Sequence, residues 1–438
     1  MDDSSGRLKR ALGPLSLWGL GVGYVISGEY FGWNLGLPLG GSLGMLIATL
    51  VVTVMYAGFT LGYAELACAL PRAGGAFVYA SRAFGPRVGA LAGIAQALEF
   101  LFAPPAIAMA IAAYVSQRYP GLDPRLFALA AYLIFTALNA WGVKQAAAFE
   151  LLVTVLAVAE LVLFIALTLP HFRLEAFRAE ALPNGVAGTF AALPFAIWFY
   201  LGIEGIANAA EEAENPQRDV AFGFAAALIT LVVLALGVFF AAVGVAGWRA
   251  VVYAPGSSEP SDAPLPLALG LVVSPDSVLY TLLLGVGMLG LVASFHGILL
   301  AAARATMELG RAGYAPRLLG KVHAKSGTPR VALLVNMLFG ALAILSGRTA
   351  DIITLSVLGA LSMYALSLAS FFRLRAREPA LSRPFRAPLY PFLPGLALLV
   401  AVLCLVAVAW TAALTALLFA LLMLAGISLR VRDREPAV

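Results

Sequence analysis

Four acidic residues lie near the centres of long apolar segments, where charged side chains are rare: Glu29, Glu99, Glu160 and Glu204. The apolar segments around them contain no Lys or Arg that would pair with them. An ionised group at the centre of a bilayer costs roughly 2.5 to 3.5 kcal/mol, so such groups face the protein interior. An unpaired carboxylate there either takes up a proton or binds a cation. Both outcomes suit a proton-coupled carrier of a positively charged amine.

The stretch from Gly21 to Asn34, which contains Glu29, is a poor helix former. Its sequence GVGYVISGEYFGWN carries glycines where a plain membrane span would carry Leu and Ala. Interrupted backbone at membrane depth is tolerated only where it is buried in protein or lines a cavity. The sequence therefore predicts a broken first helix, with the Glu29 carboxylate in a cavity.

A second interruption is predicted at 193–208, LPFAIWFYLGIEGIAN, where Gly202 and Gly205 flank Ile203 and Glu204. This segment is the sixth predicted span, five spans after the first. Matching interruptions in the two halves of a chain indicate an inverted-repeat transporter whose binding site lies at the bilayer midplane. The alternative is that the glycines only let helices pack closely.

The other candidate residues each have two interpretations. Glu99 precedes a Pro-Pro pair that opens its helix, and it either lines the cavity or packs. Glu204 either contacts substrate or proton, or accepts hydrogen bonds from amides freed by the break. Glu160 is either a proton site or an interhelical hydrogen-bond acceptor. Trp198 and Tyr200 either close over a bound cation through their ring faces or are packing residues.

The composition is that of an integral membrane protein. Of 438 residues, 62% are hydrophobic and 12% are charged, against about 25% charged in soluble domains. We predict twelve spans between charged and turn residues, each about as long as a bilayer requires. They are 12–37, 43–70, 88–117, 126–143, 147–169, 188–210, 220–247, 277–310, 330–346, 351–373, 388–408 and 410–429.

The basic residues orient these spans. With the N-terminal segment 1–11 and the C-terminal segment 430–438 both in the cytoplasm, 22 of the 28 Lys and Arg lie on the cytoplasmic side. The net charge of +5 thus belongs to membrane-flanking loops, so no nucleic acid partner is predicted. The segment 249–276, rich in Pro, Ser and Asp, is predicted to be a flexible external loop.

Six ordered motifs resemble the amino acid–polyamine–organocation transporter family. This resemblance implies five helices (12–169), an inverted repeat of five (188–373) and two further helices (388–429), without a cofactor. The motifs are GVGYVISGEYF, AELACALPRAGGAFVYASRAFGP at 64–86, LNAWGVKQAA at 138–147, FYLGIEGIANAAEEAENPQRDV at 199–220, GYAPRLLGKVHAKSGTPRVAL at 313–333 and RPFRAPLYPFLPG at 383–395.

Two departures from the family pattern concern the substrate. Amino-acid carriers of the family usually have Gly-Ser-Gly or Gly-Thr-Gly in the first break, where free amides hold the substrate carboxylate; this chain has Ser27, Gly28 and Glu29. Several also have a Lys in span five, and the matching position here is Glu160. This variant resembles most the ethanolamine permease branch, whose substrate has an ammonium group and no carboxylate.

The resulting hypothesis is an all-α polytopic protein of the bacterial cytoplasmic membrane that imports a small amine, with ethanolamine favoured, by alternating access. Protons are the predicted coupling ion, carried by Glu29, Glu160 or Glu204. Sodium has less support, since span eight offers only Ser294 near its middle. The predicted substrate-binding residues are Tyr24, Ser27, Gly28, Glu29, Glu99, Trp198, Tyr200, Gly202, Ile203 and Glu204.

Three alternatives stay open at this point. The nearest is a permease or exchanger for amino acids or polyamines. An intramembrane enzyme is disfavoured, because the chain has no HExxH metal pair and only three His; no metal site is predicted. A sensor or channel is the third alternative.

Overall fold

A computed structural model describes residues 12–72, 74–119, 121, 123–141, 147–323 and 326–428. The predicted cytoplasmic termini, 1–11 and 430–438, lie outside these ranges. Within them the chain is helical, and eight helices are long and apolar enough to cross a membrane. These are α3 (Leu37–Ala69), α5 (Pro86–Ser116), α6 (Pro124–Trp141), α7 (Ala147–Thr168), α11 (Pro216–Ala246), α14 (Val278–Arg311), α16 (Thr349–Arg377) and α17 (Phe392–Thr411).

Three shorter apolar helices complete the set: α9 (Gly185–Trp198), α15 (Arg330–Ser346) and α18 (Ala413–Ser428). Large apolar side chains are exposed along several helices, with Trp410 and Leu414 at 85% and 82% exposed. In a membrane such surfaces face lipid, and helices satisfy their own backbone hydrogen bonds there. The protein is therefore an all-helical, polytopic membrane protein.

Each of the twelve predicted spans overlaps a helix, and the first span is broken into shorter helices, as predicted. It comprises α1 (Pro14–Val25), α2 (Ser27–Tyr30) and the 3-10 helix η1 (Trp33–Gly36). Helix α3 extends from Leu37, but Gly41, with φ +66° and ψ −174°, interrupts it, so the continuous helix begins after Gly41, close to the predicted 43. The short turn before Gly41 carries Pro38, and proline is favoured in the first turn of a helix. That all twelve segments cross the bilayer stays a prediction.

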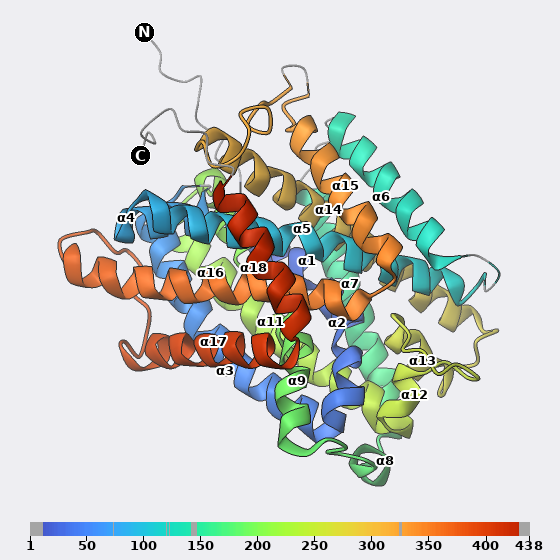
Figure 1. Cartoon of the computed structure of the whole chain (residues 1–438). Coiled ribbons are helices and arrows are strands. Elements are labelled where there is room, and N and C mark those ends of the chain that lie inside the picture. Colours follow the sequence, from blue (N-terminus) through green and yellow to red (C-terminus); the bar gives the residue numbers. More distant parts are fainter. Residues whose placement is uncertain are drawn as a thin grey trace.

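The helices pack in pairs that recur between the two halves of the chain. Helix α1 packs against α11, and α9 packs against α3; likewise α5 packs against α16, and α14 against α7. Helices α3 and α11 pack against each other, as do α5 and α14. Figure 1 shows α3, α16 and α17 side by side, in keeping with their mutual contacts.

The segments between the long helices contain further short helices: α4 (Gly75–Phe84), η2 (Leu169–His171), α8 (Leu174–Arg178), α12 (Trp248–Val252) and α13 (Pro264–Gly270). The prediction of a flexible loop at 249–276 is therefore wrong. Its apolar residues Val251, Val252 and Leu265 are buried, and Tyr253 pairs with Pro260. The Pro and Ser content indicated turns, whereas the buried side chains between them fix the segment.

Asp262 attaches this segment to the start of α16, where the Thr349 hydroxyl donates to its carboxylate over 2.8 Å. Burial raises the pKa of Asp262 from 3.8 to about 6, although the hydrogen bond from Thr349 opposes this rise. The folded protein therefore keeps a proton between about pH 4 and 6 that the unfolded chain has lost. The proton bound to Asp262 stabilises the folded state relative to the unfolded chain, and this contribution is lost as the pH rises through 6.

We expect Asp262→Asn to stabilise the protein at pH 7.5 by about 1 to 2 kcal/mol, because a neutral amide replaces a partly buried charge and still accepts from Thr349. Near pH 4 the variant and the parent are expected to melt together. Thermal unfolding of the purified protein at both pH values measures the difference. An equal gain at pH 4 and pH 7.5 would show that charge is not the cause.

Candidate functional site

The two interrupted segments meet in the middle of the fold. Helix α1 ends at Val25 and α2 begins at Ser27. Helix α9 ends at Trp198, and α10 (Gly205–Asn208) begins after six intervening residues, 199–204. A Cβ added at Gly28 would lie 2.4 Å from the Trp198 carbonyl oxygen. The two backbones are thus in direct contact, and only glycine fits at position 28. Both predicted interruptions are present.

Tyr24, a predicted site residue, holds α1 against the second break and against α14. Cβ atoms added at Gly205 and Gly297 would lie 2.5 and 2.8 Å from its ring. Gly202, with φ +101°, takes a backbone conformation that favours glycine and faces the Tyr24 carbonyl group. Ile203, another predicted site residue, is fully buried in the same break.

Glu29 is completely buried, and neither of its carboxylate oxygens has a hydrogen-bond partner. Its backbone is engaged: the carbonyl accepts from the Trp33 indole N–H at 3.2 Å, and the N–H donates to the Ile26 carbonyl at 3.0 Å. Across the described ranges, no Lys or Arg forms an ion pair with any of the four mid-helix acids. A buried polar group without a partner is unfavourable. Glu29 thus presents two free acceptor atoms to a ligand or a proton, inside a site that is closed to solvent.

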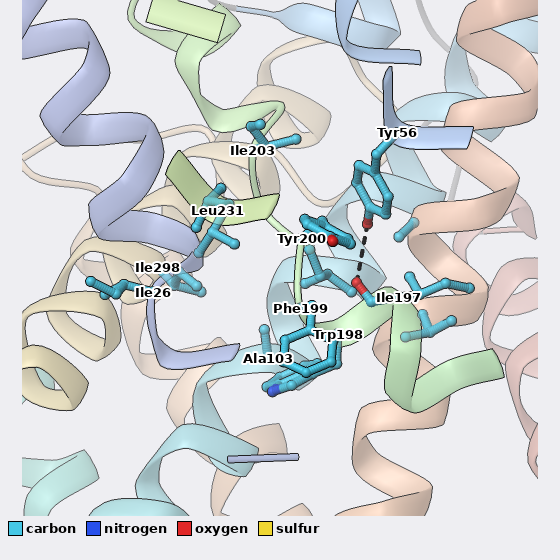
Figure 2. Close-up of a cluster of buried hydrophobic side chains, with 14 of the residues drawn as sticks. Ile26, Tyr56, Ala103, Ile197, Trp198, Phe199, Tyr200, Ile203, Leu231 and Ile298 are labelled. Carbon is cyan, nitrogen blue, oxygen red and sulfur yellow. Dashed lines mark hydrogen bonds between the residues drawn. The ribbon is translucent and has the colours of Figure 1, made fainter. Parts of the chain in front are cut away.

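Trp198 and Tyr200 have different surroundings, although the sequence predicts that both cover one ligand. The Trp198 ring lies against Gly32 and Phe31 of the first break, and its indole N–H has no partner. The Tyr200 hydroxyl is hydrogen-bonded to Thr53 of α3 at 2.7 Å. In Figure 2, Tyr200 lies beside Tyr56, with ring centroids 5.0 Å apart. Only Trp198 therefore offers an unused donor.

Glu204 and Glu99 form an acidic pair beside the second break. Both are fully buried, and neither oxygen of Glu99 nor Oε1 of Glu204 has a hydrogen-bond partner. Tyr364 of α16 donates to Glu204 Oε2 at 3.1 Å, and its hydroxyl lies 3.0 Å from that of Tyr56. Tyr56 in turn donates to the Ile197 carbonyl group, as the dashed line in Figure 2 marks. A buried carboxylate without a partner takes up a proton or binds a cation, so these two acids are candidates for either.

Glu160 does not join this group but contacts the first break through Tyr30. The Tyr30 hydroxyl donates to Glu160 Oε2 at 2.7 Å. Both interpretations of Glu160 made from sequence are compatible with this bond, since an interhelical acceptor is also able to carry a proton.

Ser27 and Ser294 connect the first break to α14. The Ser294 hydroxyl donates to the Tyr24 carbonyl oxygen at 2.9 Å and lies 2.9 Å from the Ser27 hydroxyl. These are the oxygen types on which a sodium site would draw. In this structure these oxygens are hydrogen-bonded to one another.

Sequence reasoning missed one acid, Glu150. Its Oε1 lies 3.6 Å from the positions that Cβ atoms would take at Gly23 and at Gly297, so its side chain reaches between α1 and α14. Because Glu150 falls in the first turn of a predicted span, it was not counted among the mid-helix acids. Its spacing of four residues from Thr154, whose hydroxyl donates to the Gly19 carbonyl at 3.2 Å, places both on the α1-facing side of α7.

Comparison with known proteins places the chain in a family. The family model described as amino acid permease matches residues 12–428. An uncharacterized transporter of Rhizobium meliloti (strain 1021) is 28% identical, with 91% of this chain and 86% of the relative covered. The branched-chain amino acid permease BcaP of Bacillus subtilis (strain 168) is 25% identical, with 92% and 89% covered. The methylthioribose transporter of the same strain is also 25% identical, with 88% and 86% covered.

The extent of this match fits the fold and the two broken helices described above. The family model spans nearly the whole chain, so it covers both broken helices and the helices that pack around them. The protein is therefore a multi-pass membrane transporter and not an enzyme, and it belongs to the amino acid permease family of the amino acid–polyamine–organocation superfamily.

Proposed function

We propose that this permease carries a solute with an ammonium group, that amino acids are the main class, and that Glu29 binds the ammonium group. The observation that carries the proposal is the Glu29 carboxylate, which is fully buried and has two oxygens without partners. An ammonium donates charge-assisted hydrogen bonds to such a carboxylate. It also supplies the positive charge that the described basic side chains do not.

The second polar group at this break is the indole N–H of Trp198, a buried donor without a partner that lies against Gly32. A donor suits an oxygen of the substrate, either a carboxylate or a hydroxyl. Amino acids and ethanolamine both combine an ammonium group with such an oxygen. The family and the permease BcaP favour amino acids over ethanolamine. Ethanolamine, and polyamines, remain candidates because of Glu29 in the first break.

Two further features support a secondary active carrier. The recurring helix pairs, α1 with α11 and α9 with α3, support an inverted repeat of 12–169 and 188–373, and such repeats move against each other in alternating access. The buried, unpartnered oxygens of Glu99 and Glu204 support a proton-holding site beside the second break. The charge bias of the loops supports cytoplasmic termini in the cell membrane.

The experiment is uptake into proteoliposomes of labelled lysine, leucine, putrescine and ethanolamine, each with and without an inward proton gradient. We expect accumulation of an amino acid at least about 10-fold above gradient-free vesicles. Ethanolamine accumulation without amino acid uptake would identify the amine branch instead. Accumulation of a solute without an amino group, such as methylthioribose, while no amine competes, would contradict the proposal.

A further inference from the structure

Three polar side chains from different helices meet where α4 begins. A Cβ added at Gly75, the first residue of α4, would lie 3.0 Å from the Tyr63 hydroxyl of α3. It would also lie 3.0 Å from Oδ1 of Asn208 in α10 and 3.7 Å from the side-chain amide nitrogen of Gln96 in α5. The three polar atoms thus surround one point, and the start of α4 lies against all of them.

Two of these polar groups are buried and unused. Tyr63 is 1% exposed and Gln96 is 5% exposed. Neither the Tyr63 hydroxyl nor the Gln96 amide nitrogen has a hydrogen-bond partner. The Ala76 N–H of α4 lies near the Tyr63 hydroxyl without the geometry of a hydrogen bond. Since buried polar groups in folded proteins are normally paired, both groups are available to a ligand.

These groups continue the polar lining of the second break toward α4. Gln96 precedes Glu99 by three positions on α5, so both side chains project from the same face of that helix. Tyr63 follows Tyr56 by seven positions on α3, and Tyr56 is hydrogen-bonded to the backbone just before the second break. A solute that leaves Glu99 and Glu204 along these two helix faces therefore meets Gln96 and Tyr63 next.

The start of α4 lies on the side of the membrane that the sequence predicts to be cytoplasmic. The loop that contains α4 carries Arg72, Arg82 and Arg87, and basic residues favour the cytoplasmic side. Gln96 and Tyr63 thus lie between the second break and the predicted cytoplasmic end of the protein.

The three groups suit a small polar solute. The Gln96 amide nitrogen donates to an oxygen, Oδ1 of Asn208 accepts from an N–H group, and the Tyr63 hydroxyl does either. An amino acid or an amino alcohol offers both an ammonium group and an oxygen. Neutral groups bind such a solute more weakly than a buried carboxylate does, as a position on the way out requires.

We propose that Tyr63, Gln96 and Asn208 form a release site, a second and weaker binding position that the solute occupies on its way to the cytoplasm. The start of α4 and the solute compete for these three groups, so α4 gives way when the solute binds. Gly75 fits there because a side chain would be strained at φ +48° and would press on the three polar atoms. This inference rests on the proposed function, because it adds a step to the path of the same solute.

A cysteine at position 74 reports whether the start of α4 moves. A Cβ added at Gly74 would meet only the Val78 side chain, and both native cysteines, Cys68 and Cys404, are buried. Gly74→Cys is combined with Glu29→Gln, which removes the charged group of the first site. The labelling rate with a membrane-impermeant maleimide is then measured in inside-out vesicles, against the concentration of whichever of lysine, leucine, putrescine or ethanolamine the protein carries.

We expect the solute to raise the labelling rate at least about 3-fold. Gln96→Leu and Tyr63→Phe should each raise the half-saturating solute concentration about 3- to 10-fold, the effect of one lost neutral hydrogen bond. The matched control is Tyr132→Phe, because the Tyr132 hydroxyl is also buried without a partner but lies against Gly340 of α15. It should leave the half-saturating concentration within about 2-fold.

Gln96→Leu and Tyr63→Phe should melt no lower than the parent, because neither polar group has a hydrogen bond to lose. A labelling rate that ignores the solute would overturn the release site, and so would equal half-saturating concentrations in all variants. Uptake of the amine through Glu29 would then still stand. Conversely, if no amine is carried but methylthioribose raises the labelling rate and Gln96→Leu weakens that response, the proposed function fails and the release site stands.

Discussion

Replacing Glu29 by glutamine is expected to lower the uptake of an amine substrate by about 100-fold. The substitution keeps the size of the side chain but removes the charge that would pair with the ammonium group. Truncating one partner of a buried, hydrogen-bonded charge pair costs about 2 to 5 kcal/mol, and about 1.4 kcal/mol corresponds to a factor of ten. The loss should appear as a raised KM and a lowered counterflow rate, since binding itself is impaired.

The control for this variant is Glu308→Gln. Glu308 is an exposed acid on α14 that pairs with Arg311 over 2.9 Å, and its removal should leave uptake within about 2-fold. The folding of both variants is checked by their melting temperatures. Glu29→Gln is expected to melt no lower than the parent, because the glutamic acid has no partner to lose. Unchanged uptake would remove Glu29 from the substrate site.

The broken helices were predictable because their cause is local. Glycines around Ser27 and around Ile203 lower helix propensity within a few residues, and an acid at each break marks it as polar. The structure has both interruptions, and Gly28 lies against the backbone of Trp198. What the sequence could not show is that the two breaks touch, because their contact joins residues far apart in the chain.

The partners of the acids were not predictable for the same reason. Nothing in the sequence around Tyr30 distinguishes it from other tyrosines in membrane spans, yet its hydroxyl donates to Glu160. Tyr364, which donates to Glu204, lies in α16 and outside both breaks. Such pairs depend on which faces of distant helices meet. The spacing of apolar residues shows which face of a helix is buried, but it does not show which other helix packs against that face.

The short helices between the spans illustrate a third limit. Pro and Ser at 255–262 correctly indicate turns, but the buried Leu265 and Val252 on either side decide whether the segment is ordered. Turn signals describe the backbone locally. Burial depends on the rest of the fold, so a turn-rich segment is easily mistaken for a flexible one.

The second large effect is expected at Glu65, whose carboxylate connects α3 to two later segments of the chain. It accepts the Arg375 Nε–H at 2.8 Å and the Ala387 amide at 2.7 Å, and it lies 3.3 Å from Arg383 Nε. Glu65 is only 1% exposed. The motif at 64–86 that supplies Glu65 and the motif at 383–395 that supplies Arg383 thus meet in one ion-pair network.

Glu65→Gln is expected to lower the free energy of unfolding by about 3 to 5 kcal/mol, because two arginines lose the charge that compensates them. Thermal or denaturant unfolding in detergent measures it. The matched control is Glu378→Gln, whose bidentate pair with Arg82 has side chains 32% and 41% exposed. That loss should stay below about 1 kcal/mol.

A double variant separates lost charge pairing from lost packing. Removing one partner of a buried pair leaves an uncompensated charge, whereas replacing both partners by uncharged residues removes that penalty. Glu65→Gln combined with Arg375→Met should therefore be more stable than Glu65→Gln alone. Arg375 also lies 4.0 Å from the ring centroid of Tyr390, and the methionine keeps an apolar contact there. If the double variant is instead as unstable as the sum of its single substitutions, the guanidinium contributes through packing, and the network is not what holds α3 to α16.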